Sequence, residues 1–327
     1  MTPIRLSRAP WLVALSLLAI GMRSAAQAAA VRAASSPPSV VEIADPSRYA
    51  RVVAVSDVHG MAKPLIALLR AAHLIDSRSR WTGGRTLVVV VGDSIDKGPD
   101  SLGVLKLWLA LGPKAEAAGG GIMHLLGNHE AEFLSAPTHD RKARELLKEM
   151  RNDHVPLADL TDPARPMGAY LRRMPLAARV GRWLFCHAGL YPDMSWPAFK
   201  AHAALVLSKG EYGDDFITGN DSILEAKNWW KAPATRAALE RRLEANGMFG
   251  LVQGHQPKAY GIKDQIGAID GGRLIKIDCG MPPQAGSHLG SLLLFPHPAE
   301  MTRDAMPEVE VVETNGKVAP LDIRSGP

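Results

Sequence analysis

Residues 86–98 read TLVVVVGDSIDKG, an apolar run that ends abruptly in glycine and acidic residues. Such a run is typical of a strand buried on both faces, and the polar residues mark the loop that follows it. The chain has 327 residues, of which 46% are hydrophobic and 22% charged, as in ordinary globular proteins. This length is enough for one large or two small domains with a substantial core.

The same order of apolar run and polar loop occurs in two other segments. Arg51–Val55 (RVVAV) is followed by Ser56–Gly60 (SDVHG), and Ile122–Leu126 is followed by Gly127–Glu130 (GNHE). The segments between these runs carry apolar residues at helical spacing, namely Leu65–Leu74 and Pro99–Leu111. A repeated order of strand, loop and helix predicts an α/β fold with mostly parallel strands.

The polar loops contain side chains that bind divalent cations. Asp57 and His59 are two positions apart and therefore face the same way if the strand pairing continues, and Asp93 follows the neighbouring strand. The carboxyl ends of parallel strands meet at one edge of a sheet, so these loops should form one site. Predicted strands at Trp183–Phe185 and Met248–Val252 add further polar residues, so that the set is Asp57, His59, Asp93, Asn128, His187 and His255. Nitrogen and oxygen ligands without thiolates suit manganese, iron or zinc, and two such ions can clamp a displacement at phosphorus.

Five motifs in a fixed order carry a family resemblance. They are Asp57-x-His59, Gly92-Asp93-x-x-Asp96, Gly127-Asn128-His129-Glu130, His187-Ala188-Gly189 and Gly254-His255. Over residues 51–281 the chain resembles the calcineurin-like metallophosphoesterase superfamily, of the phosphoprotein phosphatase type. This resemblance implies a four-layer αββα sandwich of two mixed β-sheets flanked by helices, with helical insertions at 131–175 and 195–247 covering the site.

Wider phrases around these motifs indicate a branch of the superfamily. The chain resembles the Shewanella-like phosphatases at Trp81-x-Gly83-Gly84, Ala118–Gly121 and Asp278–Met281. Gly98–Leu102 is equally similar to bacterial phosphoprotein phosphatases and diadenosine-tetraphosphate phosphatases. Among these branches, the Shewanella-like phosphatases are the favoured prediction.

The resemblance also implies a role for each matching residue. Asp57 and His59 would bind a first metal ion and Asp93 would bridge, while a second ion would be held by Asn128, His187 and His255. His129 would protonate the leaving oxygen, oriented by Asp96, after attack by a metal-bridged hydroxide. The expected cofactors are two divalent ions, with manganese favoured over iron, zinc or magnesium.

Two lysines occupy positions where the family's pattern has phosphate-binding arginines. Lys97 follows Asp96, and Lys231 in Asn228–Lys231 (NWWK) is the best match for a second such position. Lysine keeps the positive charge but loses the bidentate geometry of a guanidinium group. The replacement of arginine by lysine should therefore affect the orientation of the substrate more than the chemical step.

The predicted function is that of an exported, metal-dependent phosphatase acting on phosphomonoesters. The expected substrate is a phosphoprotein, including phosphotyrosine, or a small phosphomonoester. One alternative is a hydrolase of diadenosine polyphosphates or other nucleotides, and another is a catalytically silent phosphate-binding module. The oligomeric state cannot be deduced from these residues.

The N-terminus has the pattern of a cleavable secretory signal. Basic residues precede an apolar run from Trp11 to Ile20, and Ala26-Gln27-Ala28 matches a signal-peptidase site. The run is shorter than the roughly 20 apolar residues of a membrane-spanning helix, so no stable anchor is expected after cleavage, and an uncleaved anchor is the alternative. The predicted organisation is a signal peptide at 1–28, a linker at 29–48, the phosphoesterase domain at 49–300 and a C-terminal strand and tail at 301–327. The expected location is the periplasm or the exterior.

Signal cleavage changes the interpretation of the net charge, which is +5 for the whole chain. The first 28 residues contain three arginines and no acid, so 38 Lys and Arg less these three leaves 35 against 33 Asp and Glu. The net charge of the remaining chain is then +2, and nucleic acid is not an expected partner.

Three features remain open in the sequence. Cys186 and Cys279 are either buried thiols or a disulfide pair, because the sequence gives no distance between them. Trp229 and Trp230 suit a ring-stacking wall and a core position equally. The charged helix predicted at 141–151 is either a solvated face or a border of the site that attracts acidic phosphopeptides.

Overall fold

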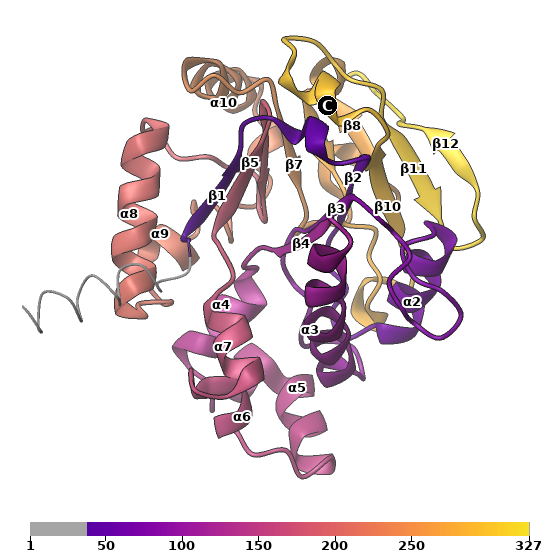
Figure 1. The fold of residues 1–327 in the computed structure, drawn as a ribbon. Helices are drawn as coiled ribbons and strands as arrows, with labels where there is room; N and C mark the ends of the chain where they lie inside the picture. The colour runs from indigo at the N-terminus through magenta and orange to yellow at the C-terminus, as the bar shows by residue number, and fades with distance from the viewer. Residues whose placement is uncertain (1–37, 327) are drawn as a thin grey trace, which may run out of the picture. The chain divides into compact units, whose positions relative to one another are not determined.

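The valine-rich runs form the middle of one six-stranded sheet. In the computed structural model, which describes residues 38–326, β2 and β4 flank β3 in parallel, and β10, β11 and β12 extend the sheet with antiparallel pairing (Figure 1). The order across this sheet is β12, β11, β10, β2, β3, β4. The strands are β2 (Arg51–Val55), β3 (Thr86–Val90), β4 (Gly121–His124), β10 (Ser291–Phe295), β11 (Glu310–Glu313) and β12 (Val318–Pro320).

A second six-stranded sheet has the order β1, β5, β6, β7, β9, β8. Its pairs β1 with β5, β6 with β7 and β7 with β9 are parallel, whereas β5 with β6 and β8 with β9 are antiparallel. The strands are β1 (Val40–Ile43), β5 (Ala177–Val180), β6 (Trp183–Cys186), β7 (Gly250–Gln253), β8 (Gly267–Ile269) and β9 (Leu274–Lys276).

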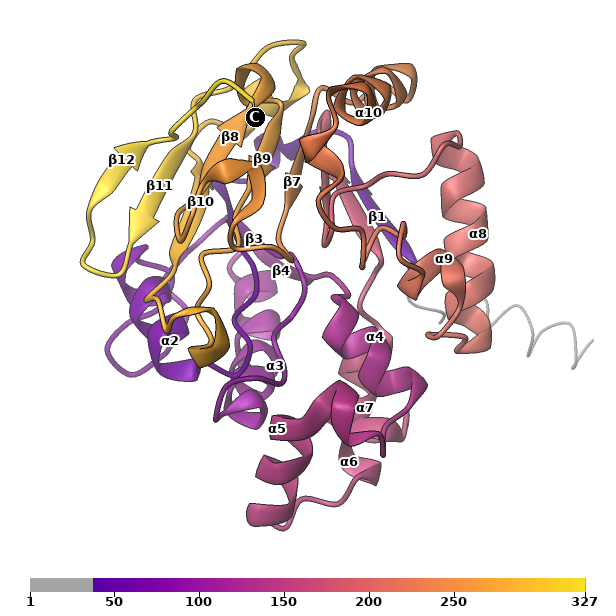
Figure 2. The same cartoon turned by 180° about the vertical axis from the view of Figure 1, so that it is seen from behind.

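The alternation of side chains along each strand produces four layers. Val52 and Ala54 of β2 face Phe185 of β6 in a core between the sheets, while Val53 and Val55 face helices on the other side. The helices on that side are α2 (Ala62–Ala71) and α3 (Ser101–Ala117). The outer face of the second sheet packs mainly on α8 (Trp196–Lys209) and α10 (Pro233–Ala245), seen from behind in Figure 2. The predicted αββα sandwich of two mixed sheets is confirmed.

The two predicted insertions are helical, as expected. The first contains α4 (Asn128–Ser135), α5 (Asp140–Asn152), α6 (Ala158–Thr161) and α7 (Pro166–Arg172), and the second contains α8, α9 (Asp215–Thr218), η2 (Trp229–Lys231) and α10. Shorter 3-10 helices lie elsewhere, at η1 (Pro46–Arg48), η3 (Ala259–Gly261), η4 (Asp270–Gly272), η5 (Pro283–Ala285) and η6 (Pro298–Thr302).

The first insertion is tied to the sandwich by a buried carboxylate. Glu149 of α5 accepts hydrogen bonds from the backbone N–H groups of Ser101 at 2.7 Å and Leu102 at 2.9 Å, the first two residues of α3. These N–H groups have no partner within their own helix, so Glu149 satisfies donors that would otherwise be buried.

The ends of the fold differ from the prediction. β1 lies in the segment predicted as a linker (29–48) and pairs with β5, so ordered structure begins before residue 49. At the other end, 301–327 contains two strands instead of one strand and a tail, and Ile323 forms a further bridge to Ala268 of β8. Both segments supply main-chain hydrogen bonds to sheet edges, which short or proline-containing sequences do not reveal. The predicted signal peptide at 1–28 lies outside the described residues.

Cys186 and Cys279 are both free and buried. They belong to different clusters of the core, since Cys186 packs on the helical side of the second sheet and Cys279 packs between the sheets. Burial raises the pKa of the Cys186 thiol to about 12, which makes it unreactive. The disulfide alternative is thereby excluded in this structure.

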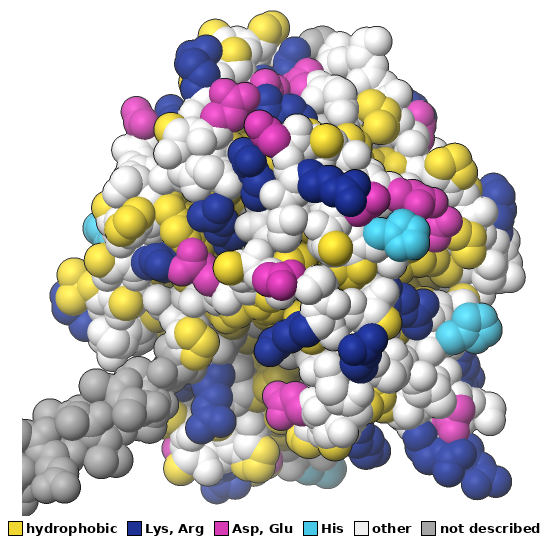
Figure 3. Space-filling model, turned by 45° about the horizontal axis from the view of Figure 1, so that its top comes forward, with side chains coloured by type: hydrophobic (Ala, Val, Ile, Leu, Met, Phe, Trp, Pro, Cys, Tyr) yellow, Lys and Arg dark blue, Asp and Glu magenta, His cyan; other side chains and the backbone are white. Residues whose placement is uncertain are grey.

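The surface of the described part carries interspersed charges. Figure 3 shows Lys and Arg side chains alternating with Asp and Glu over the displayed face. Within residues 38–326, no helix combines the length and apolar character that crossing a membrane requires.

Replacing Glu149 with alanine should destabilise the protein by about 1–3 kcal/mol, because two buried N–H groups of α3 lose their acceptor. The measurement is the free energy of unfolding in urea. Lys148→Ala is the matched control on the same helix, since Lys148 is 62% exposed and its ammonium group lies 3.5 Å from Glu145. Equal stability of the two variants would contradict this capping role.

Candidate active site

The loops that follow the strands of both sheets meet and exchange main-chain hydrogen bonds. The N–H of His59 donates to the carbonyl oxygen of Asp93 at 2.8 Å, and the N–H of His129 donates to Asp93 Oδ1 at 3.0 Å. Across the two sheets, the N–H of His255 donates to Asp57 Oδ2 at 2.9 Å. The strand ends therefore converge as the sequence predicted, and all six predicted metal ligands lie in this cluster.

Two histidines direct their Nε2 atoms toward one carboxylate. His59 Nδ1 lies 3.1 Å from the carbonyl oxygen of Ile95, and His187 Nδ1 lies 2.9 Å from that of Val91. A proton on each Nδ1 leaves a lone pair on Nε2, and both Nε2 atoms lie 3.3 Å from Asp93 Oδ2. Asp93 is thus placed between two imidazoles, as a bridging ligand would be.

The remaining predicted ligands complete the cluster on either side of Asp93. Asn128 Oδ1 and His255 Nδ1 lie 3.0 Å and 3.2 Å from His187 Nε2, and Asp57 Oδ1 lies 3.8 Å from His59 Nε2. These are nitrogen and oxygen donors whose lone pairs converge, an arrangement that fits divalent cations. The donor set therefore suits two metal ions that share Asp93.

The electrostatics of the cluster indicate an excess of buried negative charge. Burial raises the pKa of Asp57, and the nearby carboxylates of Asp278 and Asp93 raise it further. Asp278 is also buried, and burial raises its pKa to about 6. Burial opposes ionisation of Asp93 as well, but three neighbouring histidines, with His187 foremost, hold its pKa well below the usual value. Cations among these carboxylates would compensate their charge.

Several cluster residues have left-handed backbone conformations, with φ between 44° and 67°. They are Asp57, His59, Asp93, Asp96, Lys97 and His255. This region is uncommon for residues other than glycine, and such conformations cost about 1–3 kcal/mol each unless the surroundings enforce them. Their concentration in one place marks the cluster as the functional part of the fold.

Glu130 is a functional residue that the sequence analysis placed in a motif without a role. Its fully buried carboxylate accepts hydrogen bonds from four backbone N–H groups, those of Asp93, Ser94, Ile95 and Gly127, at 2.8–3.2 Å. It therefore fixes the loop that carries Asp93 to the start of α4. Its position in GNHE was the available signal.

Glu225 was missed because no local pattern marks it. Its Oε1 accepts a hydrogen bond from Asn128 Nδ2 at 3.0 Å. An ionised carboxylate accepts and does not donate, so it selects the amide nitrogen of Asn128 and turns Oδ1 toward His187. The backbone around Glu225 is held in turn, because the N–H of Ala188 donates to the carbonyl oxygen of Ile223 at 2.7 Å.

The predicted acid and its partner lie beside the ligand cluster. His129 Nδ1 is 3.2 Å from Asp96 Oδ2, and Asp96 Oδ1 accepts from the N–H groups of Glu145 and Leu146 in α5. Burial alone would raise the pKa of Asp96, yet its hydrogen bonds to His129 and α5 lower it. Helix α5 thus borders the site, as one of the two alternatives for 141–151 expected.

Lys97 also lies at the cluster, with Nζ 2.9 Å from His59 Nε2. A hollow of about 320 Å³ at the cluster is lined by Lys97 and His129, together with Asp96, Arg144, Glu145 and Gln284. Another hollow, of about 430 Å³, lies near α9 and contains none of the predicted site residues. Lys231 is exposed and lines a hollow that adjoins the one at the cluster. The structure therefore brings Lys97 to the predicted acid and leaves Lys231 further out.

Trp229 and Trp230 are core residues. Their rings are only 6% and 3% exposed and contact Tyr260 edge to face, and Trp229 Nε1 donates to the carbonyl oxygen of Ala188 at 2.9 Å. Of the two alternatives from the sequence, the stacking wall is wrong.

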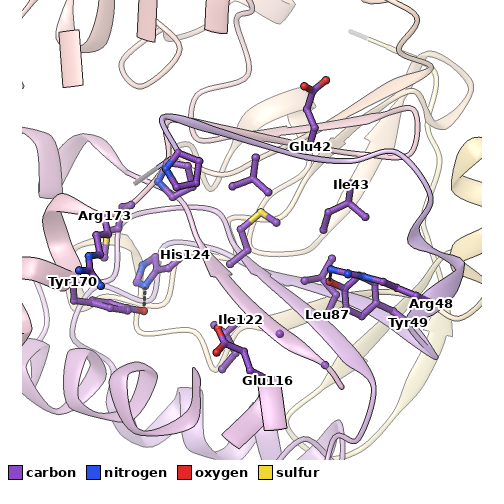
Figure 4. Close-up of a pocket in the computed structure, with 17 residues that line it drawn as sticks. Glu42, Ile43, Arg48, Tyr49, Leu87, Glu116, Ile122, His124, Tyr170 and Arg173 are labelled. Carbon is purple, nitrogen blue, oxygen red and sulfur yellow. Dashed lines mark hydrogen bonds between the residues drawn. The ribbon is translucent and has the colours of Figure 1, made fainter. Parts of the chain in front are cut away.

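A separate hollow of about 540 Å³ lies between the edge strands β1 and β4 (Figure 4). His124 and Tyr170 line it and lie 2.8 Å apart between Nδ1 and the hydroxyl oxygen. Burial lowers the pKa of His124 to about 3, so the ring is neutral. None of the predicted site residues lines this hollow.

The family model of the calcineurin-like phosphoesterases matches residues 50–273, which include every one of these cluster residues except Asp278. The chain belongs to this family. Among curated relatives, it is 46% identical over 80 residues to Shewanella-like protein phosphatase 2 of Arabidopsis thaliana, covering 24% of this chain and 20% of that protein. The Shewanella-like relationship predicted from the sequence is confirmed.

Other relatives of this phosphoesterase extend the comparison. An uncharacterized protein of Schizosaccharomyces pombe is 36% identical over 272 residues, which cover 72% of this chain and 74% of that protein. A symmetrical bis(5'-nucleosyl)-tetraphosphatase of Methylococcus capsulatus is 28% identical and covers 51% and 52%. The crystal structure of a cold-active protein-tyrosine phosphatase of a Shewanella species has a TM-score of 0.69 at 21% identity, covering 87% and 82%, and shows the shared fold. The chain thus spans about a fifth to a half of the two curated phosphatases named here.

Gly92→Ala should destabilise the phosphoesterase more than Gly84→Ala. Both residues have positive φ, but a Cβ on Gly92 would lie 2.6 Å from the Cα of Gly127, whereas nothing lies within 4 Å at Gly84. The difference in free energy of unfolding should be about 1–3 kcal/mol, the usual effect of overpacking. Urea unfolding of both variants measures this difference. Equal losses of stability would mean that the loops carrying Gly92 and Gly127 can move apart without cost.

Glu225→Ala should weaken metal binding about 10- to 100-fold, because the Asn128 amide loses the acceptor that orients it. Glu225→Gln keeps an acceptor oxygen and should restore most of the affinity. Titration of the metal-free protein with Mn²⁺, followed by electron paramagnetic resonance, gives the affinities. Glu211→Ala, at an exposed position near Lys209, is the control, and wild-type affinity in Glu225→Ala would refute the orienting role.

Proposed function

We propose that this chain is a metal-dependent phosphatase that hydrolyses phosphomonoesters, with phosphoproteins as its substrate class. The observation that carries the proposal is the His129 and Asp96 pair beside a cluster of converging metal ligands. A general acid must lie next to the leaving group that it protonates. A phosphate bound at the metal-ligand cluster would place its leaving oxygen beside His129. Membership of the phosphoesterase family and the relatives named as phosphatases support this proposal.

The residues of the chain would divide the reaction between them. Asp57, His59 and Asp93 on one side, and Asp93, Asn128, His187 and His255 on the other, would hold two divalent ions. When bound, such ions supply a nucleophile at neutral pH and neutralise charge in a displacement at phosphorus.

His129 would then act on the leaving oxygen. Asp96 Oδ2 lies 3.2 Å from Nδ1, so it would orient a protonated ring with the Nε2 proton toward the leaving group. Lys97 Nζ lies 2.9 Å from His59 Nε2, the nitrogen that would bind a metal ion. The ammonium group and a metal ion would therefore compete for this nitrogen. With the ion in place, the ammonium group is available to an anionic substrate oxygen.

Export to the periplasm or the exterior is part of the proposal and rests on residues 1–28. An exported enzyme meets little cytosolic nucleotide, which favours phosphoproteins over dinucleotides. The tetraphosphatase relatives make dinucleotides a necessary arm of any substrate test.

His129→Ala should lower kcat about 10²- to 10⁴-fold, the usual contribution of a general acid. The purified protein with Mn²⁺ is assayed on an aryl phosphate, on phosphotyrosine and phosphoserine or phosphothreonine peptides, and on diadenosine tetraphosphate. Removal of the metal with a chelator should abolish hydrolysis, and added Mn²⁺ should restore it.

His297→Ala is the control, because this ring is 62% exposed and contacts only Glu308 among the described residues. An unchanged rate in His129→Ala would refute its role as the acid. Failure of the metal-loaded protein to hydrolyse any phosphomonoester would refute the function itself, and a preference for the dinucleotide would replace the substrate class.

A further inference from the structure

The hollow around His129 adjoins a second hollow. The first contains Lys97 and His129, the second has a volume of about 480 Å³, and Gln284 lines both. Gln284 Nε2 donates to the carbonyl oxygen of Lys97 at 3.1 Å, which places the shared wall directly against the phosphate-binding position. Residues next to a phosphorylated residue bound in the first hollow would therefore lie near the second.

The second hollow is lined by hydrogen-bond donors and contains no acid. Its residues come from η2, from the loop after β7 and from η5, and they are Asn228, Trp230, Lys231, Gln256, Pro257, Lys258, Gln284 and Ala285. Within residues 38–326, neither Lys231 nor Lys258 takes part in an ion pair. Two lysines without an ion-pair partner, around a hollow that no acid lines, indicate an anionic occupant.

The shape of the wall distinguishes a carboxylate side chain from a nucleotide. A nucleobase is commonly bound by stacking on an aromatic face. Trp230 is the only tryptophan, tyrosine or phenylalanine among the residues that line the two hollows, and its ring is 3% exposed because it packs on Tyr260. The hollow thus offers charge and hydrogen bonds without a stacking surface.

We propose that this second hollow binds an acidic side chain close to the phosphorylated residue of a protein substrate, with Lys258 as a specificity-determining residue. The inference rests on the proposed phosphatase function and adds a sequence preference to it. Lys258 is exposed and takes part in no ion pair within residues 38–326, so its ammonium group can act as a point charge that favours carboxylates over amides.

The test compares two phosphopeptides that differ only in Asp and Glu or Asn and Gln beside the phosphorylated residue. The readout is the ratio of their kcat/KM values, which a general loss of activity does not change. The wild-type ratio should favour the acidic peptide, and Lys258→Ala should lower it about 2- to 5-fold, the effect of one exposed charge pair. Lys258→Glu should lower the ratio further, and high salt should lower the wild-type ratio.

Lys263→Ala is the matched control, because Lys263 is a nearby lysine with 69% side-chain exposure, 3.6 Å from Asp264. Its ratio should equal that of the wild type. An unchanged ratio in Lys258→Ala and Lys258→Glu, in a protein that hydrolyses the aryl phosphate, would overturn this inference and leave the phosphatase function standing. Absence of hydrolysis of every phosphomonoester would instead refute the function on which it rests.

Discussion

The geometry of the cluster depends on one buried carboxylate, that of Glu130. Four backbone N–H groups from two loops point at its oxygens, and no water is needed to satisfy them. Buried N–H groups without acceptors would cost free energy, so the loops after β3 and β4 are stable together only with this acceptor between them. Asp93 is therefore held in position by backbone contacts of its own loop, and its side chain accepts from the N–H of His129 with Oδ1 while Oδ2 faces the histidines.

The first helical insertion is part of the same construction. Asp96 accepts from the backbone of α5 with one oxygen and contacts His129 with the other, while Glu149 of α5 accepts from the start of α3. Asp96, in the loop after β3, thus accepts from the backbone of α5 in the insertion, and Glu149 of α5 caps the start of α3 in the sandwich. Orientation of His129 and docking of α5 are consequently coupled.

The sequence predicted the parts of the fold that its local patterns encode. β2, β3 and β6 are continuous apolar runs, and their positions agree with the prediction within one residue. β5, β8 and β9 were not predicted, because runs of only three or four residues give no distinct periodicity. Their strand character comes from pairing with β6 and β7, which is a tertiary effect.

The same division applies to the site. The ligands follow strand ends and could be identified in order, because each motif is local. The contact of Asn128 with Glu225 joins residues 97 positions apart, and the approach of Asp278 to Asp57 joins the two sheets. Such partners are set by the packing of loops from distant segments, and the single sequence contains no signal for that packing.

The two buried thiols have a consequence for the conditions under which the chain folds. Because the sequence contains only Cys186 and Cys279, and a β-sheet separates their surroundings, the fold forms without any covalent cross-link. Neither an oxidising environment nor a disulfide-forming catalyst is required for its assembly. The same structure is therefore accessible on either side of a membrane, whichever redox potential prevails there.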